Sequence, residues 1–338
     1  MRRAALLLGL VVLIGGGAAR YAFVLLLERP GPPLGAPVRI DVAPGEPFRV
    51  TAAKLEKAGL VPSALVLALW ARFAGIDRQI QHGAYQFVEP LTPMALVEKM
   101  RSGEAMMIHV TLPEGATARD LALVLEQSGL GPADKFLVLL RDGAFAQSLG
   151  VSAPVLEGYL FPDTYFFSPL DSAEKILGSF VGRFQKVFTP EMAAEAEQGG
   201  FTIHQIVTLA SVIEKETARE DERPLVAAVF RNRLRRGMPL QADPTVIYGI
   251  ENFNGNLTRK DLATRTPYNT YTEAGLPPGP IANPGRSSLL AALHPADVPY
   301  LYFVARDDGS HEFNATLADH NRAVNRYQRS RQARMQAG

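Results

Sequence analysis

Carboxylates, hydroxyls, an amide and an aromatic side chain are concentrated between Thr202 and Gly249, where the sequence reads TIHQIVTLASVIEKETAREDERPLVAAVFRNRLRRGMPLQADPTVIYG. Thr202 followed by Gln205 fits a capping box, so a helix is predicted to begin there. Apolar side chains then recur in steps of three and four residues, which indicates one buried face. That face consists of Ile206, Leu209, Ala210, Ile213 and Thr217.

The same helix carries two acidic side chains, Glu214 and Glu216. At about 100° per residue they fall on opposite flanks of the buried face. The two carboxylates are therefore not expected to share one site, and only one should face a cleft. The periodicity does not decide between them, because both lie at a similar angle from the centre of the apolar stripe.

A second amphipathic helix is predicted after Pro224, with its end at Gly237. Most of its basic side chains are interpreted as a solvated face, although an anionic polymer or a lipid surface would also suit them; the basic side chains are Arg231, Arg233, Arg235 and Arg236. Asp243 and Pro244 then fit an N-cap followed by proline at the first helical position.

The composition is that of a globular protein long enough for two domains, at 338 residues. Lys plus Arg (35) nearly balances Asp plus Glu (34), so no basic field indicates nucleic acid as a partner. The absence of cysteine excludes disulfides, thiolate metal sites and cysteine nucleophiles.

The N-terminus predicts a membrane anchor over residues 1–28. Arg2 and Arg3 precede an apolar run over 4–19, and after Arg20 a second apolar run extends over 21–27. Together the runs reach the roughly 20 residues that a spanning helix needs, with Arg20 at the outer interface. The basic start predicts a cytoplasmic N-terminus. A cleaved signal peptide is the competing interpretation, but residues 18–20 fit its cleavage site poorly.

A small α+β module is predicted over 38–107, after a Pro-rich linker over 29–37 that should be an extended spacer without structure. The expected elements are strands at 38–42 and 83–87 and helices at 51–58, 63–73 and 92–101. Trp70 and Tyr85 are interpreted as core residues.

A larger α+β domain is predicted over 108–330, followed by a tail over 331–338. A strand is expected at 108–112, a helix capped by Thr117 that ends near Gln127, and helical segments between 133 and 149. Further on, a helix is expected at 287–293, a hairpin from strands at 300–305 and 311–313, and a last helix at 316–329. The Pro- and Gly-rich loops at 267–271 and 276–285 should wall a cleft.

The segment 156–165 is rich in aromatic residues and also carries two acidic residues. Tyr159, Phe161 and Tyr165 could line a sugar groove, or they could be core residues. The sequence leaves these two interpretations open.

Several reaction classes lack their motifs, because no Walker loop, G-x-S-x-G elbow or H-E-x-x-H pair occurs. His294, His311 and His320 have no paired ligand spacing, so no metal site is predicted. A glutamate on an apolar helix can instead act as a general acid at neutral pH, as glycosidic cleavage requires. A hydrolase would need a second carboxylate, for which Asp243 and Asp163 are candidates, whereas a transglycosylase needs only one.

The chain closely resembles the endolytic murein transglycosylases, the MltG or YceG-like family. The similarity rests on motifs in and beyond the Thr202–Gly249 stretch; they are Ala210–Ala218, Glu222–Arg223, Asn232–Leu234, Leu240–Gln241, Asp243–Gly249, Glu157–Gly158, Phe161–Thr164, Tyr268–Tyr271, Gly275–Ile281, His294–Pro295 and Tyr300–Val304. These motifs cover nearly everything after residue 108.

The resemblance implies a lytic transglycosylase that needs no cofactor and cleaves the MurNAc–GlcNAc β-1,4 bond of nascent peptidoglycan strands. Such cleavage leaves 1,6-anhydroMurNAc ends and stops strand elongation. In lytic transglycosylases the catalytic glutamate is followed by Ser or Thr, which selects Glu216 as general acid and base over Glu214. By adjacency to the motifs, the residues expected to bind the glycan or position the acid are Gln241, Asp243, Thr245, Tyr248, Asn269 and Tyr271.

The resemblance also implies a bacterial inner-membrane protein with a periplasmic catalytic domain and a LysM-like module at 38–107. Peptidoglycan strands, membrane lipid and peptidoglycan synthases are the expected partners. Two alternatives remain, namely a non-enzymatic peptidoglycan-binding scaffold and a muramidase that uses two carboxylates and water.

Overall fold

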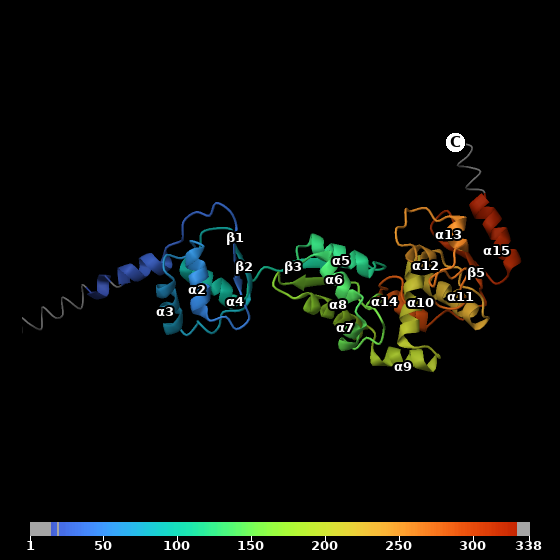
Figure 1. Ribbon diagram of the computed structural model, residues 1–338, viewed down its shortest axis with the longest axis horizontal. Coiled ribbons are helices and arrows are strands. Elements are labelled where there is room, and N and C mark those ends of the chain that lie inside the picture. The colour runs from blue at the N-terminus through green and yellow to red at the C-terminus, as the bar shows by residue number, and fades with distance from the viewer. Residues whose placement is uncertain (1–14, 19, 330–338) are drawn as a thin grey trace, which may run out of the picture. The chain divides into compact units, whose positions relative to one another are not determined.

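The computed structural model describes residues 15–18 and 20–329, which divide into two compact units (Figure 1). Unit 1 holds the chain up to His109 together with Phe166–Asp171, and unit 2 holds Val110–Tyr165 and everything from Ser172 onward. The chain therefore crosses the division three times, whereas the sequence predicted a single boundary at residue 107.

The expected membrane anchor lies largely outside the described residues, because 1–14 and 19 are not among them. The helices that are described include none with the length and apolar character needed to cross a bilayer. Residues Val24–Glu28 form a π-helical turn (η1), and Leu27 at its end is buried in the core of unit 1.

The Pro-rich segment 29–37 is attached to unit 1 and is not the free spacer that its composition suggested. The backbone N–H of Gly31 donates to the carbonyl of Leu91 at 3.1 Å. Leu34 packs against the hydrophobic core. These contacts shorten the reach that this segment could provide.

Unit 1 contains a two-stranded antiparallel sheet, β1 (Val38–Val42) and β2 (Gly83–Phe87), with Ile40 opposite Tyr85. Three helices accompany it, α2 (Phe48–Lys57), α3 (Ala64–Phe73) and α4 (Pro93–Ser102). Tyr85 is fully buried, and its hydroxyl donates to the carbonyls of Gln81 and Met100 at 2.8 and 3.0 Å. Trp70 is partly buried against the same core, so both aromatics are core residues as predicted.

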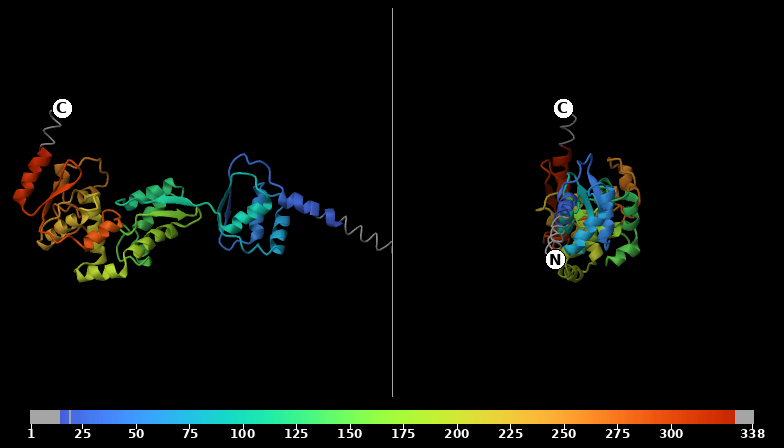
Figure 2. Two further views of the ribbon diagram at one scale, coloured as in Figure 1. Left: turned by 180° about the vertical axis from the view of Figure 1, so that it is seen from behind. Right: turned by 90° about the vertical axis from the view of Figure 1, so that its left-hand side faces the viewer.

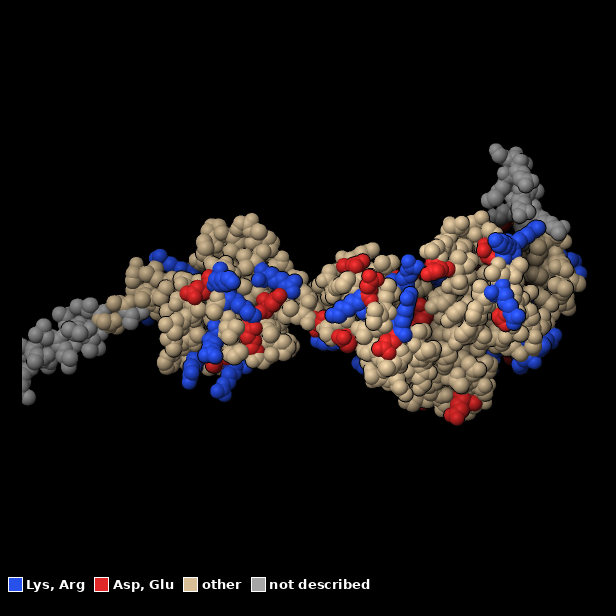
Figure 3. Space-filling model, viewed as in Figure 1, with Lys and Arg blue, Asp and Glu red and all other residues tan. Residues whose placement is uncertain are grey.

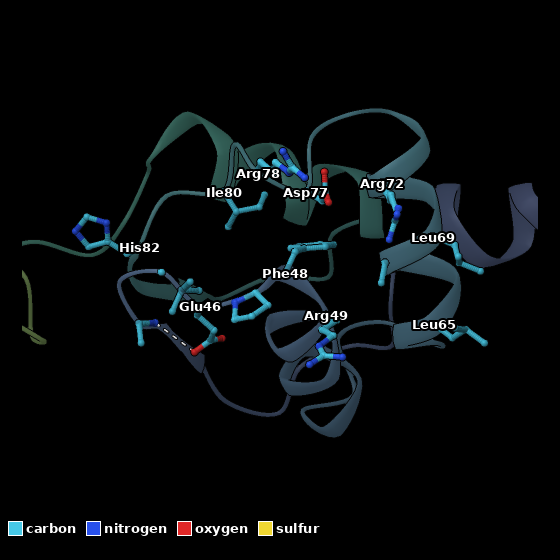
Figure 4. Close-up of a pocket in the computed structure, with 15 residues that line it drawn as sticks. Glu46, Phe48, Arg49, Leu65, Leu69, Arg72, Asp77, Arg78, Ile80 and His82 are labelled. Atoms are coloured by element: carbon cyan, nitrogen blue, oxygen red, sulfur yellow. Dashed lines mark hydrogen bonds between the residues drawn. The ribbon is translucent and has the colours of Figure 1, made fainter.

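Unit 1 also has a cavity of about 530 Å³, with Phe48 at its centre in Figure 4. Ile80 and Asp77 lie on one side of Phe48, and Arg49 lies on the other. Glu46 at the rim is held by hydrogen bonds from Thr51 Oγ1 and Lys54 Nζ. The cavity contains both cationic and apolar surface.

The chain enters unit 2 within β3 (Ile108–Thr111), which pairs with β4 (Thr164–Phe167). Helices α5 (Ala118–Gln127), α6 (Ala133–Leu140), α7 (Gly143–Ser148), α8 (Ala173–Val187) and α9 (Pro190–Gln198) build one part of it. Thr117 and Asp120 form a capping box at the start of α5, which confirms the predicted cap. The sequence analysis assigned no element to β4, α8 or α9.

The other part of unit 2 is built around α10 (Ile203–Glu216), which packs against α11 (Arg223–Arg235), α12 (Asp243–Tyr248) and α14 (Arg286–Leu293). The capping box of Thr202 and Gln205 is present as predicted. Every residue from Ile206 to Ile213 is buried, so the helix is enclosed on all sides and not on one stripe alone. A central helix in this position holds its last turn rigidly.

The remaining elements are α13 (Arg259–Ala263), the antiparallel hairpin of β5 (Tyr302–Ala305) and β6 (His311–Asn314), α15 (Leu317–Val324) and the π-helical turn η2 (Asn325–Arg329). The hairpin confirms the predicted strand pair. Helix α15 lies at the edge of unit 2 in both views (Figures 1 and 2) and contacts both strands of the hairpin. Basic and acidic side chains are interspersed on the face shown in Figure 3, in keeping with the balanced composition.

The aromatic segment 156–165 belongs to the core. Tyr159 and Phe161 are buried, and the Tyr165 hydroxyl donates to the Phe161 carbonyl at 2.6 Å. The structure therefore favours core residues over a sugar groove for this segment. Asp163 bonds Arg183 Nε at 2.8 Å and does not line the cavity that contains Glu216.

Candidate active site

Glu216 is the last residue of α10, where the helix emerges from the core. Thr217 takes an extended conformation and ends the helix. The half-buried Glu216 side chain lines a cavity of about 370 Å³ in unit 2. Residues from six other segments complete the wall of this cavity, which we call the Glu216 pocket; they include Arg233, Gln241, Asp243, Tyr271, Phe303, His311 and His320.

Burial raises the pKa of Glu216 to about 8, with the negative charge of Asp243 acting in the same direction and the positive charge of Arg233 opposing it. A carboxyl group with this pKa is mostly protonated at neutral pH. Within the part of the chain that the structure describes, no hydrogen bond engages the Glu216 carboxyl group. Its proton is therefore free to be donated to a bound molecule.

Glu214 is in a different environment. One of its oxygens accepts from Arg223 Nη2 at 2.9 Å, and the other accepts from the Gly285 backbone N–H at 2.9 Å. Both side chains of the ion pair are almost completely buried. Glu214 therefore joins α10, the start of α11 and the start of α14, and both its oxygens are occupied.

The buried position of Arg233 contradicts, for this residue, the interpretation that the basic side chains of α11 face solvent. Its side chain is buried, and Nε donates to the Leu301 carbonyl at 2.7 Å while Nη1 donates to the Leu240 carbonyl at 2.8 Å. The guanidinium also lies over the ring of Tyr302, 5.2 Å from its centroid. This network holds a fixed positive charge in the wall of the Glu216 pocket.

Gln241 and Asp243 follow Arg233 in the pocket wall. The Gln241 side-chain oxygen accepts from Arg233 Nη1 at 3.3 Å, and its backbone has φ 51°. Among the described residues other than glycine it alone has a positive φ. Asp243 is the first residue of α12 and is not its N-cap, because Ala242 occupies the N-cap position. The N-cap prediction for Asp243 is therefore wrong.

Tyr271 instead binds the Asp243 carboxylate. Its hydroxyl donates to Asp243 Oδ1 at 2.6 Å. Burial raises the pKa of Tyr271 above its ordinary value, and the hydrogen bond to the Asp243 carboxylate raises it as a second, smaller effect. Glu216, Gln241, Asp243 and Tyr271 are thus four predicted site residues that lie together around one cavity.

Thr245 and Asn269 lie behind this wall and do not line the pocket. Thr245 is fully buried, and its hydroxyl bonds the Thr270 hydroxyl at 2.9 Å. The Asn269 amide donates to the carbonyls of Leu262 and Thr264 at 3.0 and 2.7 Å. Both residues fix the loops that present Asp243 and Tyr271.

Tyr248 lies at the far end of α12 and lines a different cavity. Its hydroxyl donates to Glu157 Oε2 at 3.3 Å. Glu157 is itself buried, and burial raises its pKa to about 7. Tyr248 is therefore the one predicted binding residue that lines an accessible cavity other than the Glu216 pocket.

The sequence analysis missed the contribution of the hairpin. His311 of β6 lines the Glu216 pocket, and its Nδ1 lies 2.6 Å from Glu222 Oε2. The His311 backbone N–H donates to the other Glu222 oxygen at 2.9 Å. His320 of α15 also lines the pocket and stacks on Tyr302. The motif match around Glu222 was a signal, but nothing in the sequence joined it to His311.

This pocket offers a neutral carboxyl group, a fixed guanidinium, a carboxylate and an imidazole within one small volume. Such a set can transfer protons to and from a polar, uncharged molecule. The described residues hold no group of three or more His, Asp or Glu side chains that could bind a metal ion. His294, the third histidine weighed for such a group, pairs with Glu195 at 3.2 Å.

Comparison with known proteins gives consistent matches. The model of the YceG-like family matches residues 40–326. An endolytic murein transglycosylase of Bacillus subtilis (strain 168) is 33% identical over 331 residues, which are 93% of this chain and 91% of that protein. An endolytic murein transglycosylase of Streptococcus pneumoniae serotype 2 is 29% identical, and the chain spans only 63% of its length.

A solved structure is also similar. The crystal structure of a yceG-like protein from Listeria monocytogenes superimposes with a TM-score of 0.59 at 30% identity, covering 86% of this chain and 99% of that one. The extent of the family match, together with the similarity of the Bacillus protein over almost the whole of both chains, shows that the chain belongs to the YceG-like family.

Proposed function

We propose that the protein is a peptidoglycan lytic transglycosylase that cleaves the MurNAc–GlcNAc β-1,4 bond within glycan strands. The observation that carries this proposal is Glu216, a carboxyl group with a raised pKa and no hydrogen-bond partner among the described residues, in a cavity lined by several polar side chains. The names of the Bacillus and Streptococcus relatives, both endolytic murein transglycosylases, support the choice of murein as substrate.

In the first step the Glu216 carboxyl group donates its proton to the glycosidic oxygen while the bond from that oxygen to C1 of MurNAc breaks. The GlcNAc fragment leaves as an alcohol, and positive charge develops at C1. Asp243 shares the pocket and carries the negative charge that can stabilise this centre. Tyr271 holds the Asp243 carboxylate in place through its hydroxyl.

In the second step the C6 hydroxyl of the same MurNAc attacks C1, and the Glu216 carboxylate takes the hydroxyl proton. The product is a 1,6-anhydro ring, no water is consumed, and Glu216 returns to its protonated form. Arg233 stabilises the carboxylate between the steps, since its positive charge favours the ionised form of Glu216.

Mass spectrometry of peptidoglycan digested by the purified protein tests this chemistry. We expect anhydro ends from the wild type, and Glu216→Gln should lower the rate by about 10³-fold. Glu197→Gln serves as the control, because this exposed glutamate on α9 lies outside the pocket. An unchanged rate for Glu216→Gln would remove Glu216 as the catalyst.

A muramidase that uses water is the second candidate, because Asp243 lies in the same cavity and could act as a second carboxylate. The same digest separates the two reactions: hydrolysis gives reducing ends, whereas transglycosylation gives anhydro ends. A non-enzymatic scaffold would bind glycan and release no product at all.

The cellular setting that we propose follows the N-terminal sequence. Residues 1–28 would anchor the chain in the bacterial inner membrane with the N-terminus in the cytoplasm and both units in the periplasm. Unit 1 would act as a LysM-like glycan-binding module through the cavity of Figure 4, beside peptidoglycan synthases that extend the strands. Protease added outside spheroplasts should then degrade both units, and full protection would contradict this topology.

A further inference from the structure

Helix α12 separates two cavities of unit 2. Asp243, its first residue, lines the Glu216 pocket, and Tyr248, its last residue, lines a second cavity of about 950 Å³. Five steps along the helix correspond to about 7.5 Å. Asp243 and Tyr248 are also about 140° apart around the helix, so a polymer must pass around this short helix to occupy both cavities.

The second cavity combines an apolar wall with an aromatic pair. Its apolar side chains come from α6, from α12 and from the segment that follows α12; they include Leu137, Leu140, Ile247, Ile250 and Phe253. The rings of Tyr248 and Tyr268 lie 4.9 Å apart at 56° and form one end of the cavity. A volume of this size is typical of ligand sites.

Glu157 fixes the floor of the cavity and leaves no oxygen for a ligand. One oxygen accepts from the Asn283 amide at 3.1 Å and the other from the Tyr248 hydroxyl at 3.3 Å, and the Ala118 backbone N–H is shared between them. This network holds Tyr248 in position. Recognition of a ligand must therefore come from other polar groups.

Two arginines at the rim supply those groups. Arg119 of α5 and Arg141 after α6 both line the cavity and are exposed. In the described chain neither guanidinium forms a hydrogen bond or an ion pair. Arg141 is close enough to Tyr248 for its charge to act on that hydroxyl. Unpaired guanidiniums beside an apolar wall suit carboxylates, which they bind through two parallel N–H donors.

We propose that this cavity binds the short acidic peptides that murein strands carry, with the carboxylates on Arg119 and Arg141 and the peptide's apolar groups against the wall. The inference rests on the proposed function, because it assumes a murein strand in the Glu216 pocket. The sugar alone offers at most the single lactyl carboxylate of each MurNAc, whereas the peptide carries more than one carboxylate, so the pair of arginines favours the peptide.

The test compares two substrates, one with the peptide and one in which each MurNAc keeps only its lactyl carboxylate. The full-length protein in detergent is assayed on peptide-bearing glycan strands and on the same strands after an amidase has removed the peptides. We expect a higher kcat/KM on the peptide-bearing strands. In Arg119→Ala/Arg141→Ala the ratio of the two kcat/KM values should fall about tenfold, the loss expected when charge-assisted hydrogen bonds are removed.

The matched control is Lys186→Ala/Arg236→Ala, which removes the same charge from exposed positions that line neither cavity. This variant should keep the wild-type ratio. As a second measurement, the peptide released by the amidase should inhibit cleavage of peptide-bearing strands by the wild type and inhibit the double arginine variant less.

The outcomes are distinct. Equal kcat/KM on both substrates in the wild type, or an equal loss on both substrates in the arginine variant, would overturn the peptide site while leaving the transglycosylase intact. Absence of cleavage by the wild type on either substrate would overturn the proposed function itself.

Discussion

Glu214 and Glu216 are two residues apart, yet their surroundings give them different chemistry. Glu214 has both oxygens engaged and faces a buried guanidinium. The carboxyl group of Glu216 is buried beside the Asp243 carboxylate, and both effects raise its pKa. The helical period predicted that the two side chains would face different sites. It could not tell which of them faces the pocket, because the partners that distinguish them, Arg223 and Asp243, come from other elements.

The pKa of Glu216 leads to a pH prediction. A general acid must be protonated, so kcat/KM should be level near pH 7 and fall above pH 8, by about tenfold per pH unit for a single ionisation. The measurement is initial-rate cleavage of soluble glycan strands between pH 6 and pH 10. A fall of about tenfold per pH unit that is already present from pH 6 would instead indicate an acid with an ordinary carboxyl pKa near 4.5.

The buried ion pair of Glu214 predicts a loss of stability without a loss of chemistry. Glu214→Gln leaves the buried Arg223 guanidinium with only the longer, 3.5 Å contact to the half-exposed Glu114, so the free energy of unfolding should fall by about 3 kcal/mol. Urea denaturation followed by circular dichroism measures this. Glu197→Gln, on exposed surface, should change it by less than about 0.5 kcal/mol.

Arg223 also provides a rescue for that variant. Glu214→Leu/Arg223→Met removes both charges and should recover much of the lost stability, because no unpaired charge then remains in the core. A double variant that is no more stable than Glu214→Gln would show that the contacts of the pair, and not its charges, hold α10 to α11.

Among the elements, those with local signals were predicted well. The capping boxes at Thr117 and Thr202 and the hairpin of β5 and β6 rest on side chains a few residues apart, and the structure confirms them. The loops around the site have no such signal. Asn269 and Thr245 lie in family motifs, but their hydrogen bonds order the loops behind the pocket wall. Adjacency in the sequence cannot distinguish a residue that lines the pocket from one that supports the lining residues.

The hairpin shows the same limit for the pocket itself. His311 is 89 positions from Glu222, and Arg233 contacts the backbone of Leu301 across a similar separation. Periodicity on α11 assigned Arg233 to the solvent, because it takes no account of the β5 segment that covers that face. Long-range packing therefore places Arg233, on a basic helix face, in the wall of the Glu216 pocket.

The loop between α11 and α12 carries a prediction about strain. Gln241 has φ 51°, which costs about 1–2 kcal/mol for a residue with a Cβ atom. Gln241→Gly and Gln241→Ala both remove the side-chain acceptor for Arg233, but only glycine relieves the backbone. The glycine variant should therefore be more stable than the alanine variant by about 1 kcal/mol in thermal unfolding, with both less active than the wild type.

If the two variants were equally stable, the backbone at residue 241 would not be strained, and the positive φ would have no energetic role. The activity loss in both, in contrast, tests the amide alone. This pair of variants separates the role of the loop's conformation from the role of its side chain.

For the whole molecule, composition and motif spacing predicted an α+β protein with a boundary close to residue 108, but they did not predict that Phe166–Asp171 would be assigned to unit 1. That segment begins within β4 and ends just before α8, and neither element had a sequence signal of its own. The hydrophobic core of unit 1, in contrast, is made entirely of residues between Leu27 and Met100. Each unit thus has its own apolar interior, and this has a measurable consequence.

Leu55 is fully buried in the core of unit 1, and Leu55→Ala should destabilise that unit by about 2–5 kcal/mol through the cavity that it leaves. Because the cores are separate, calorimetry should show one transition moving to lower temperature while the transition of unit 2 keeps its midpoint. Leu209→Ala in α10 is the reciprocal variant, since it empties part of the core of unit 2 alone. A single transition that moves in both variants would mean that the two units unfold as one cooperative body, and unit 1 could then not act as an independent glycan-binding module.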